Sequence, residues 1–112
     1  MQDRLSLSLQ ALADPTRRTI LARLALGEAT VTELAAPFGI SQPSISRHLK
    51  VLETAGLIEV RRKAQARPRR LRPDALRDVG DWLDGLRNLW SDSFDRLDRH
   101  LDSTSDRETR HE

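Results

Sequence analysis

One apolar stripe runs along the last third of the chain at the spacing of a helix face. Its members recur at intervals of 3, 4, 3, 4, 4, 3 and 4 residues between Leu76 and Leu101, which predicts one long helix over residues 74–102. Such a helix is about 40 Å long and exceeds what one small domain can cover, so we expect a partner helix to cover it. The stripe comprises Leu76, Val79, Leu83, Leu86, Trp90, Phe94, Leu97 and Leu101, and Trp82 and Leu89 widen it.

The composition of the 112-residue chain fits one small helical domain with much surface, or one whose core is completed by a second subunit. Apolar residues make up only 38% of it and charged residues 32%. Cysteine is absent, which excludes disulfides, thiolate metal sites and cysteine nucleophiles. We see neither a signal peptide nor an apolar run of about 18 residues, so we expect a soluble cytoplasmic protein. Residues 103–112 hold no apolar side chain and are predicted to be a disordered tail after a domain over residues 1–102.

Charge is distributed unevenly along the sequence, although the net charge is only +2. Residues 1–72 hold 13 Lys and Arg against 6 Asp and Glu, a balance of +7. Residues 73–112 hold 6 against 11, a balance of −5. The first two thirds therefore attract polyanions and the last third repels them, which predicts a part that faces DNA and a part that faces away.

Two short helices are predicted before residue 27. Leu5, Leu9 and Leu12 recur at helical spacing in the first. The pair Asp14-Pro15 starts the second, because an N-cap residue is followed by proline at the first helical position. Gly27 ends it.

The segment Thr32–Leu52 has the pattern of a helix-turn-helix. The β-branched run over residues 30–32 predicts a brief strand, with Thr32 capping a short helix over residues 33–38. Gly39-Ile40 makes a tight turn, and Ser41 caps a further helix, Ser41–Ala55. The second helix of this motif enters the major groove of DNA in known complexes.

The apolar residues of helix Ser41–Ala55 leave a polar face for recognition. Ile45, Leu49 and Leu52 share one helix face and are predicted to be buried. Gln pairs bidentately with adenine, Arg with guanine, and Ser with either base. The alternative is an ordinary helical hairpin with a polar surface. The predicted base-reading residues are Gln42, Ser44, Ser46 and Arg47, and Lys50 is predicted to contact a phosphate.

A basic segment, residues 61–72, follows a strand that begins at Leu57. It holds seven basic residues and no acidic one, and a hairpin here would meet the DNA backbone or minor groove beside the recognition helix. The alternative is a run of charge that is merely solvated. The predicted phosphate-binding residues are Arg61, Arg62, Lys63, Arg67, Arg69 and Arg70.

These segments together resemble the ArsR/SmtB family of bacterial winged-helix repressors. The resemblance rests on ALADPTRRTILARL, on VTELAAPFGISQPSISRHLKVLETAGLIEVRR, on the arginine-rich hairpin and on the long terminal helix, over about residues 8–101. The hairpin and RDVGDWLDGLRNLWSDSFDRLDRHL resemble a metal-independent branch of that family. The resemblance implies a mainly α winged helix-turn-helix with a small β-hairpin wing.

The same resemblance implies a homodimer, joined through its first and last helices, that binds an imperfect inverted repeat in a promoter and represses it. It also implies that His48 is structural or close to DNA, and we expect packing or a phosphate contact. Arg17, in the DPTR motif, is expected to tie the second helix to its neighbours, with a phosphate contact as the lesser alternative. The predicted interface residues are Leu5, Leu9, Leu76, Val79, Leu83, Leu86, Trp90 and Leu97.

Metal sensing, which is frequent in the family, is not expected. Zinc sensors of the family carry Asp-x-His and, ten residues later, a second pair of ligands. A similar spacing is formed here by Asp98, His100 and His111. However, the fourth ligand would fall beyond residue 112, and the motif lies at the end of the helix rather than near its start. No cofactor or metal is therefore predicted.

Catalysis is not predicted either, because no Ser/His/Asp set or glycine-rich phosphate loop is present. The sequence predicts a homodimeric DNA-binding repressor that acts on double-stranded promoter DNA. One alternative is a ligand-responsive regulator with an inducer site at the terminal-helix seam, where Trp82 and Trp90 would line a pocket unless they are plain core. Another is a winged helix recruited for protein–protein contact.

Overall fold

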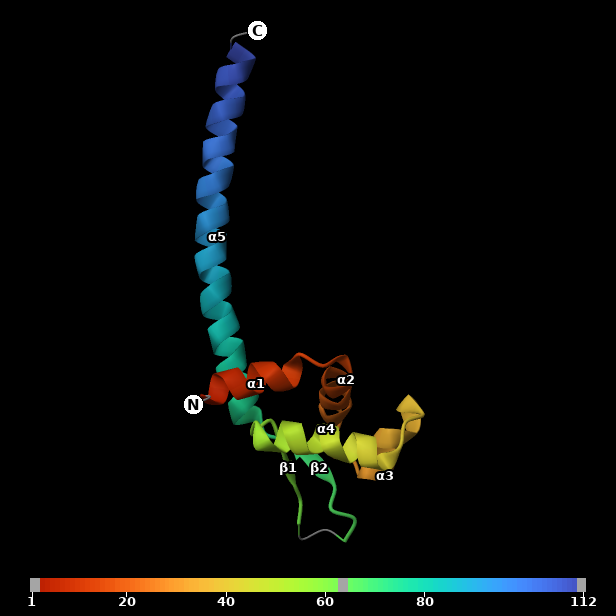
Figure 1. The fold of residues 1–112 in the computed structure, drawn as a ribbon. Coiled ribbons are helices and arrows are strands. Elements are labelled where there is room, and N and C mark those ends of the chain that lie inside the picture. The colour runs from red at the N-terminus through yellow and green to blue at the C-terminus, as the bar shows by residue number, and fades with distance from the viewer. Residues whose placement is uncertain (1–2, 63–64, 111–112) are drawn as a thin grey trace. The chain divides into compact units, whose positions relative to one another are not determined.

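The computed structural model describes residues 3–62 and 65–110, with side chains as far as residue 102. The chain forms two compact units, Met1–Val79 and Gly80–Glu112, and the last helix contributes to both. In chain order the elements are α1 (Arg4–Leu12), α2 (Pro15–Leu24), α3 (Val31–Ala35), the 3-10 turn η1 (Ala36–Phe38), α4 (Gln42–Thr54), β1 (Ile58–Val60), β2 (Arg69–Leu71) and α5 (Pro73–Arg110) (Figure 1).

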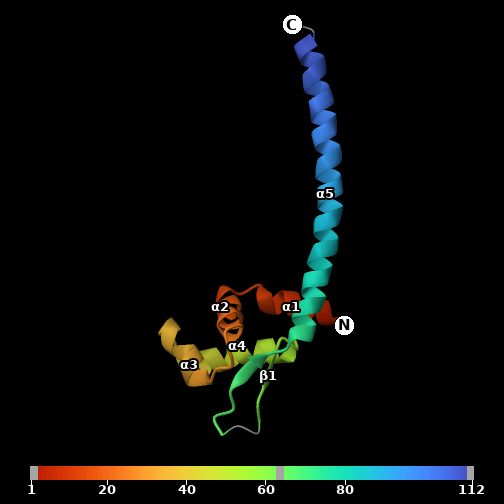
Figure 2. The same ribbon diagram turned by 180° about the vertical axis from the view of Figure 1, so that it is seen from behind.

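The first unit is a helical layer with a two-stranded hairpin. In both Figure 1 and Figure 2, β1 and β2 lie on the opposite side of α4 from α1 and α2. The strands are antiparallel, and Glu59 pairs in register with Arg70. Arg69 also forms a bridge with Ala29, which attaches the hairpin to the loop after α2. The predicted mainly α fold with a β-hairpin wing is confirmed.

Helix starts follow local capping chemistry, with one correction. The Ser41 hydroxyl accepts the N–H of Ser44 at 3.3 Å and begins α4 as predicted. Thr30, however, caps α3, because its hydroxyl accepts the N–H of Glu33 while the Glu33 carboxylate accepts the N–H of Thr30. This reciprocal arrangement is a capping box. The prediction of a strand over residues 30–32 with Thr32 as the cap was therefore wrong.

The core of the first unit is built on the predicted inner face of α4. Ile45, Leu49 and Leu52 are 0–1% exposed, and they pack in one cluster with Ile20 of α2 and Leu34 of α3. Burying side chains of this size stabilises a fold by roughly 1.5–3 kcal/mol each. This cluster fixes the orientation of α4 about its axis, so the opposite face of α4 must point outward.

The second unit is the greater part of α5, and its apolar stripe is largely uncovered in a single chain. Leu83, Trp90 and Leu97 are about half exposed, and Phe94 is 60% exposed. Two members of the stripe instead lie in the first unit, where Val79 is buried and Leu76 packs against the core. The predicted interface residues of α1, Leu5 and Leu9, also lie in the first unit and are half-buried. Large apolar side chains exposed in a row at helical spacing are characteristic of an interaction surface.

Helix α5 is longer than the sequence predicts. Its backbone is helical to Arg110, whereas a helix over 74–102 and a disordered tail over 103–112 were expected. Residues 111 and 112 lie outside the described residues. None of the helices in the described ranges combines the length and apolarity that a membrane crossing requires.

Candidate DNA-binding surface

A tight turn at Gly39 connects α3 and η1 to α4. Gly39 ends η1 with a φ of +62°, a conformation that glycine adopts at little steric cost. Across the turn, the Gln42 amide nitrogen donates to the hydroxyl of Thr32 at 3.2 Å. Leu34 of α3 and Ile45 of α4 are also buried in the same cluster, so the two helices of the motif are joined by both apolar packing and this bond.

The N-terminal half of α4 presents the predicted recognition residues. Gln42, Ser46, Arg47 and Lys50 are exposed, and Ser44 is half-buried. Arg47 donates from Nη2 to the hydroxyl of Ser44 at 3.0 Å, which lays its guanidinium along the start of the helix. Within the described residues this uses one nitrogen of a group with five N–H donors, so donors remain for a base or a phosphate.

The arginines at the base of the hairpin are paired with carboxylates of the scaffold. Arg61 donates from Nη1 to Glu28 at 3.0 Å, and Nη2 of Arg62 lies 3.9 Å from Glu53. Arg70 donates to Glu59, its partner across the strands. These pairs are partly or largely exposed, and such ion pairs are worth only about 0–1 kcal/mol. They orient the guanidinium groups but are weak enough for an anionic ligand to displace the carboxylates.

Sequence reasoning missed these three glutamates. The Glu59–Arg70 pair could have been found, because oppositely charged residues facing each other across a hairpin attract. Glu28 and Glu53 carry no such local signal, since their contacts with Arg61 and Arg62 depend on how the hairpin packs on the helices.

The remaining predicted hairpin residues differ in their availability. Arg67 is exposed, with a φ of +46°. Arg69 is half-buried and donates from Nη1 to the carbonyl of Arg67 at 2.9 Å. Its Nε is buried and has no partner among the described residues. Lys63 lies outside the described residues. Among these hairpin arginines, Arg69 is therefore the least accessible to a phosphate.

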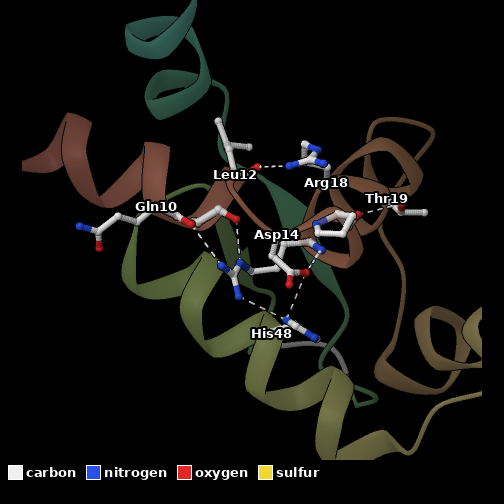
Figure 3. Close-up of polar contacts among 9 residues, drawn as sticks. Gln10, Leu12, Asp14, Arg18, Thr19 and His48 are labelled. Carbon is white, nitrogen blue, oxygen red and sulfur yellow. Dashed lines mark hydrogen bonds and ion pairs between the residues drawn. The ribbon is translucent and has the colours of Figure 1, made fainter.

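His48 is tied to the turn between α1 and α2 (Figure 3). Its Nδ1 lies 3.4 Å from Nη1 of Arg17 and 3.8 Å from Oδ2 of Asp14. The Arg17 backbone N–H, which Asp14 accepts at 3.0 Å, is the largest cause that holds the pKa of the Asp14 carboxyl below its ordinary value. Arg18 donates to the carbonyl of Leu12 at 2.7 Å. Nothing in the sequence pattern indicated the contact between Asp14 and His48.

The zinc-like motif lies on the second unit. Asp98 and His100 are on α5, and His111 lies outside the described residues. Among the side chains that the structure describes, in residues 3–62 and 65–102, no group of three His, Cys, Asp or Glu is placed to hold a metal ion.

Two relatives match most of this chain. It is 40% identical over 97 residues to the HTH-type transcriptional regulator Rv2034 of Mycobacterium tuberculosis, a match that covers 87% of this chain and 88% of that protein. It is 42% identical over 74 residues to the transcriptional repressor SdpR of Bacillus subtilis, over 66% of this chain and 82% of that protein. A family model described as a helix-turn-helix domain matches residues 12–61.

Solved structures share the fold. The crystal structure of an ArsR family transcriptional regulator superposes with a TM-score of 0.69 at 41% identity, over 80% of this chain and 98% of that one. The solution structure of the homodimeric winged helix-turn-helix DNA-binding domain Mb0332 of Mycobacterium bovis gives a TM-score of 0.63 at 29% identity, over 77% and 80%. The predicted resemblance is thereby confirmed, and this chain belongs to the ArsR family of winged helix-turn-helix transcriptional regulators.

Proposed function

We propose that this protein is a homodimeric cytoplasmic repressor that binds an inverted-repeat operator in promoter DNA. Each subunit inserts the N-terminal half of α4 into a major groove and lays its β1–β2 hairpin along the flanking backbone. The observation that carries the proposal is the exposed set Gln42, Ser46, Arg47 and Lys50 above the buried face of α4. These residue types read base edges or bind phosphates.

The charge of the hairpin supports the same function. Arg61, Arg62 and Arg70 are exposed and oriented by weak ion pairs. A phosphate oxygen can replace each carboxylate partner at the guanidinium, because both are anionic acceptors. The displaced glutamate is partly exposed and is then solvated by water. Each phosphate neutralised in this way adds about 0.9 to the slope of log affinity against log salt.

The stripe on α5 supports the homodimer. Leu83, Trp90, Phe94 and Leu97 leave large apolar surfaces in contact with water in one chain. A second copy of the same stripe covers them, as isologous interfaces do. The solved relative from Mycobacterium bovis is described as homodimeric, which is the state that an inverted-repeat operator requires.

Fluorescence anisotropy tests the proposal. The purified chain is titrated into a labelled duplex that carries the region upstream of its own gene, and into a shuffled duplex of equal length, at several salt concentrations. We expect a preference for the promoter duplex of about 10³-fold or more. Binding to neither duplex, down to low salt, would contradict a DNA-binding function and favour a winged helix that contacts proteins.

The same assay distinguishes a ligand-responsive regulator from a repressor that needs no ligand. Release of the promoter duplex by a small molecule, at constant salt, would add an inducer to the proposed function. Such a result would leave the assignment of α4 and the hairpin unchanged.

A further inference from the structure

One guanidinium connects three elements of the first unit. Arg17, in the first turn of α2, donates from Nε to the carbonyl of Ala11 at 2.7 Å and from Nη2 to that of Gln10 at 3.1 Å. Both carbonyls lie in the last turn of α1, where backbone oxygens carry partial negative charge. The third nitrogen, Nη1, lies 3.4 Å from Nδ1 of His48 on α4. Because α1 holds the group through two bonds, α1 also sets the direction of Nη1.

The chemistry of the two groups fixes where the ring of His48 holds its proton. A guanidinium has only N–H donors and no acceptor, so the Nδ1 that faces Nη1 of Arg17 must offer its lone pair. In a neutral imidazole the proton is then on Nε2. A proton on Nδ1 would instead point an N–H at a cation.

The carboxylate of Asp14 would favour the other tautomer, but it lies too far from the ring to accept a hydrogen bond from it. Its Oδ2 lies 3.8 Å from Nδ1 of His48, which is beyond hydrogen-bond reach. The same oxygen already accepts the backbone N–H of Arg17 at 3.0 Å. Asp14 therefore stabilises the turn that carries Arg17, and it does not accept a hydrogen bond from the ring of His48.

The Nε2 atom of His48 points away from this network. Figure 3 shows the second ring nitrogen directed away from Asp14. The side chain is 25% exposed, and Nε2 is not among the buried, unpartnered polar atoms of the described residues. On α4, His48 follows Arg47 by about 100° around the helix axis, at the edge between the exposed and buried faces. When a helix lies in the major groove, groups at this edge face the walls of the groove, which are phosphates.

We propose that Arg17 is a positioning residue, held by α1 and Asp14, that fixes His48 as an Nε2–H donor to a phosphate oxygen of duplex DNA. The proposal rests on the proposed function, since it names a further contact of the same surface. It also makes the end of α1 part of the DNA-binding machinery, although α1 itself lies on the far side of α4 from the hairpin.

Nitrogen NMR tests the tautomer without DNA. In ¹⁵N-labelled protein at about pH 8, we expect His48 to show an unprotonated Nδ1 and a protonated Nε2. In Arg17→Met, which keeps much of the alkyl chain, this preference should be lost while the resonances of His100 stay unchanged. A proton on Nδ1 in the wild-type protein would overturn the proposal. This measurement stands even if the protein binds no DNA.

A matched pair of substitutions tests the phosphate contact. Glutamine places an amide N–H where Nε2 lies, whereas asparagine places an amide oxygen near Nδ1 and leaves Nε2 empty. We expect His48→Gln to bind the promoter duplex nearly as wild type does, and His48→Asn to bind about tenfold more weakly. These variants leave Arg17 intact, so the test survives if Arg17→Met does not fold.

The salt dependence supplies the sharpest outcome. A neutral donor displaces no counterion, so His48→Asn should lose affinity equally at every salt concentration. If the slope of log affinity against log salt is smaller by about 0.9 in His48→Asn, then His48 binds as an imidazolium. If His48→Asn and the wild-type protein bind with equal affinity, then His48 packs against its neighbours and does not contact DNA. Either result would overturn the proposal. Failure of the wild-type protein to bind any duplex would instead defeat the proposed function.

Discussion

The guanidinium of Arg61 donates to the carboxylate of Glu28 at 3.0 Å, which joins the start of the hairpin loop to the segment after α2. The two residues are 33 positions apart in the sequence. Their ion pair is partly exposed, so it is a weak interaction. In the proposed complex Glu28 would compete with a phosphate for Arg61, and we therefore expect Glu28 to lower the affinity of the hairpin for any duplex.

Removing that competitor should strengthen binding. We expect Glu28→Gln to raise affinity for both promoter and shuffled duplexes by up to about fivefold, the equivalent of about 1 kcal/mol. Asp92→Asn, which removes an equal charge from an exposed position on α5, should have a smaller effect. Equal gains for the two variants in anisotropy titrations would mean that only net charge matters.

Arg47 should carry sequence preference. Its guanidinium lies along the start of α4, bonded to Ser44, where it can form a bidentate contact with guanine. We expect Arg47→Ala to cost about 1–3 kcal/mol of binding free energy on the promoter duplex and to relax the preference over shuffled DNA. Unchanged promoter affinity at fixed salt would show that α4 does not read bases through this residue.

Lys50 should behave differently from Arg47. It is exposed one turn after Ser46 and is assigned to a phosphate. Lys50→Ala should weaken binding to the promoter duplex and to the shuffled duplex equally. It should also reduce the slope of log affinity against log salt by about 0.9. A loss confined to the promoter duplex would place Lys50 against a base edge instead.

Local signals in the sequence predicted the parts of this fold that are decided locally. Ile45, Leu49 and Leu52 were recognisable because helical spacing alone selects a common face. The cap of α3 was misassigned to Thr32, although Glu33 stands three residues after Thr30, the spacing of a capping box. Two threonines of equal capping ability compete there, and only the position of the glutamate distinguishes them.

Contacts between distant segments were beyond the reach of the sequence. His48 meets Asp14 and Arg17, and Arg61 meets Glu28, because the helices pack at one particular angle that no spacing encodes. The partial burial of Arg69 could not be predicted for the same reason, because the sequence does not distinguish it from the neighbouring arginines. Its bridge to Ala29, its half-buried side chain and its bond to the carbonyl of Arg67 show that the fold holds it.

Acid should destabilise the first unit through its helix caps. The carboxyls of Asp3, Asp14 and Glu33 have pKa values below their ordinary values of 3.8, 3.8 and 4.5, chiefly because each accepts a backbone N–H. As pH falls, the unfolded chain takes up protons before the folded chain does. The stability these groups provide is therefore complete above about pH 5 and is lost as pH falls through the lowered values.

Replacing the capping residue Asp14 should reduce the stability that is lost at low pH. Asparagine also caps helices but does not titrate, so Asp14→Asn should narrow the difference in unfolding free energy between about pH 6 and about pH 3. Urea denaturation followed by circular dichroism measures that difference. Asp81→Asn, at an exposed position on α5 without a capping role, is the control. An unaltered pH dependence in Asp14→Asn would contradict this assignment.

The exposed stripe of α5 should hold the dimer together. Leu86 lies within the stripe, between Leu83 and Trp90, so Leu86→Glu would place a charge in an apolar seam, where an unpaired charge is costly. Light scattering should give twice the 12.7 kDa chain mass for the wild-type protein, and a monomer or an unfolded chain for the variant. Circular dichroism separates those two outcomes.

The matched control is Leu26→Glu. Leu26 is 85% exposed just after α2, off the stripe, and a substitution at so exposed a site changes stability by about 0.5 kcal/mol or less. It should leave the dimer and promoter binding intact. Because an inverted repeat is bound by two linked subunits, Leu86→Glu should lose promoter affinity even if each subunit remains folded. A well-folded dimer of Leu86→Glu would show that the subunits meet through another surface.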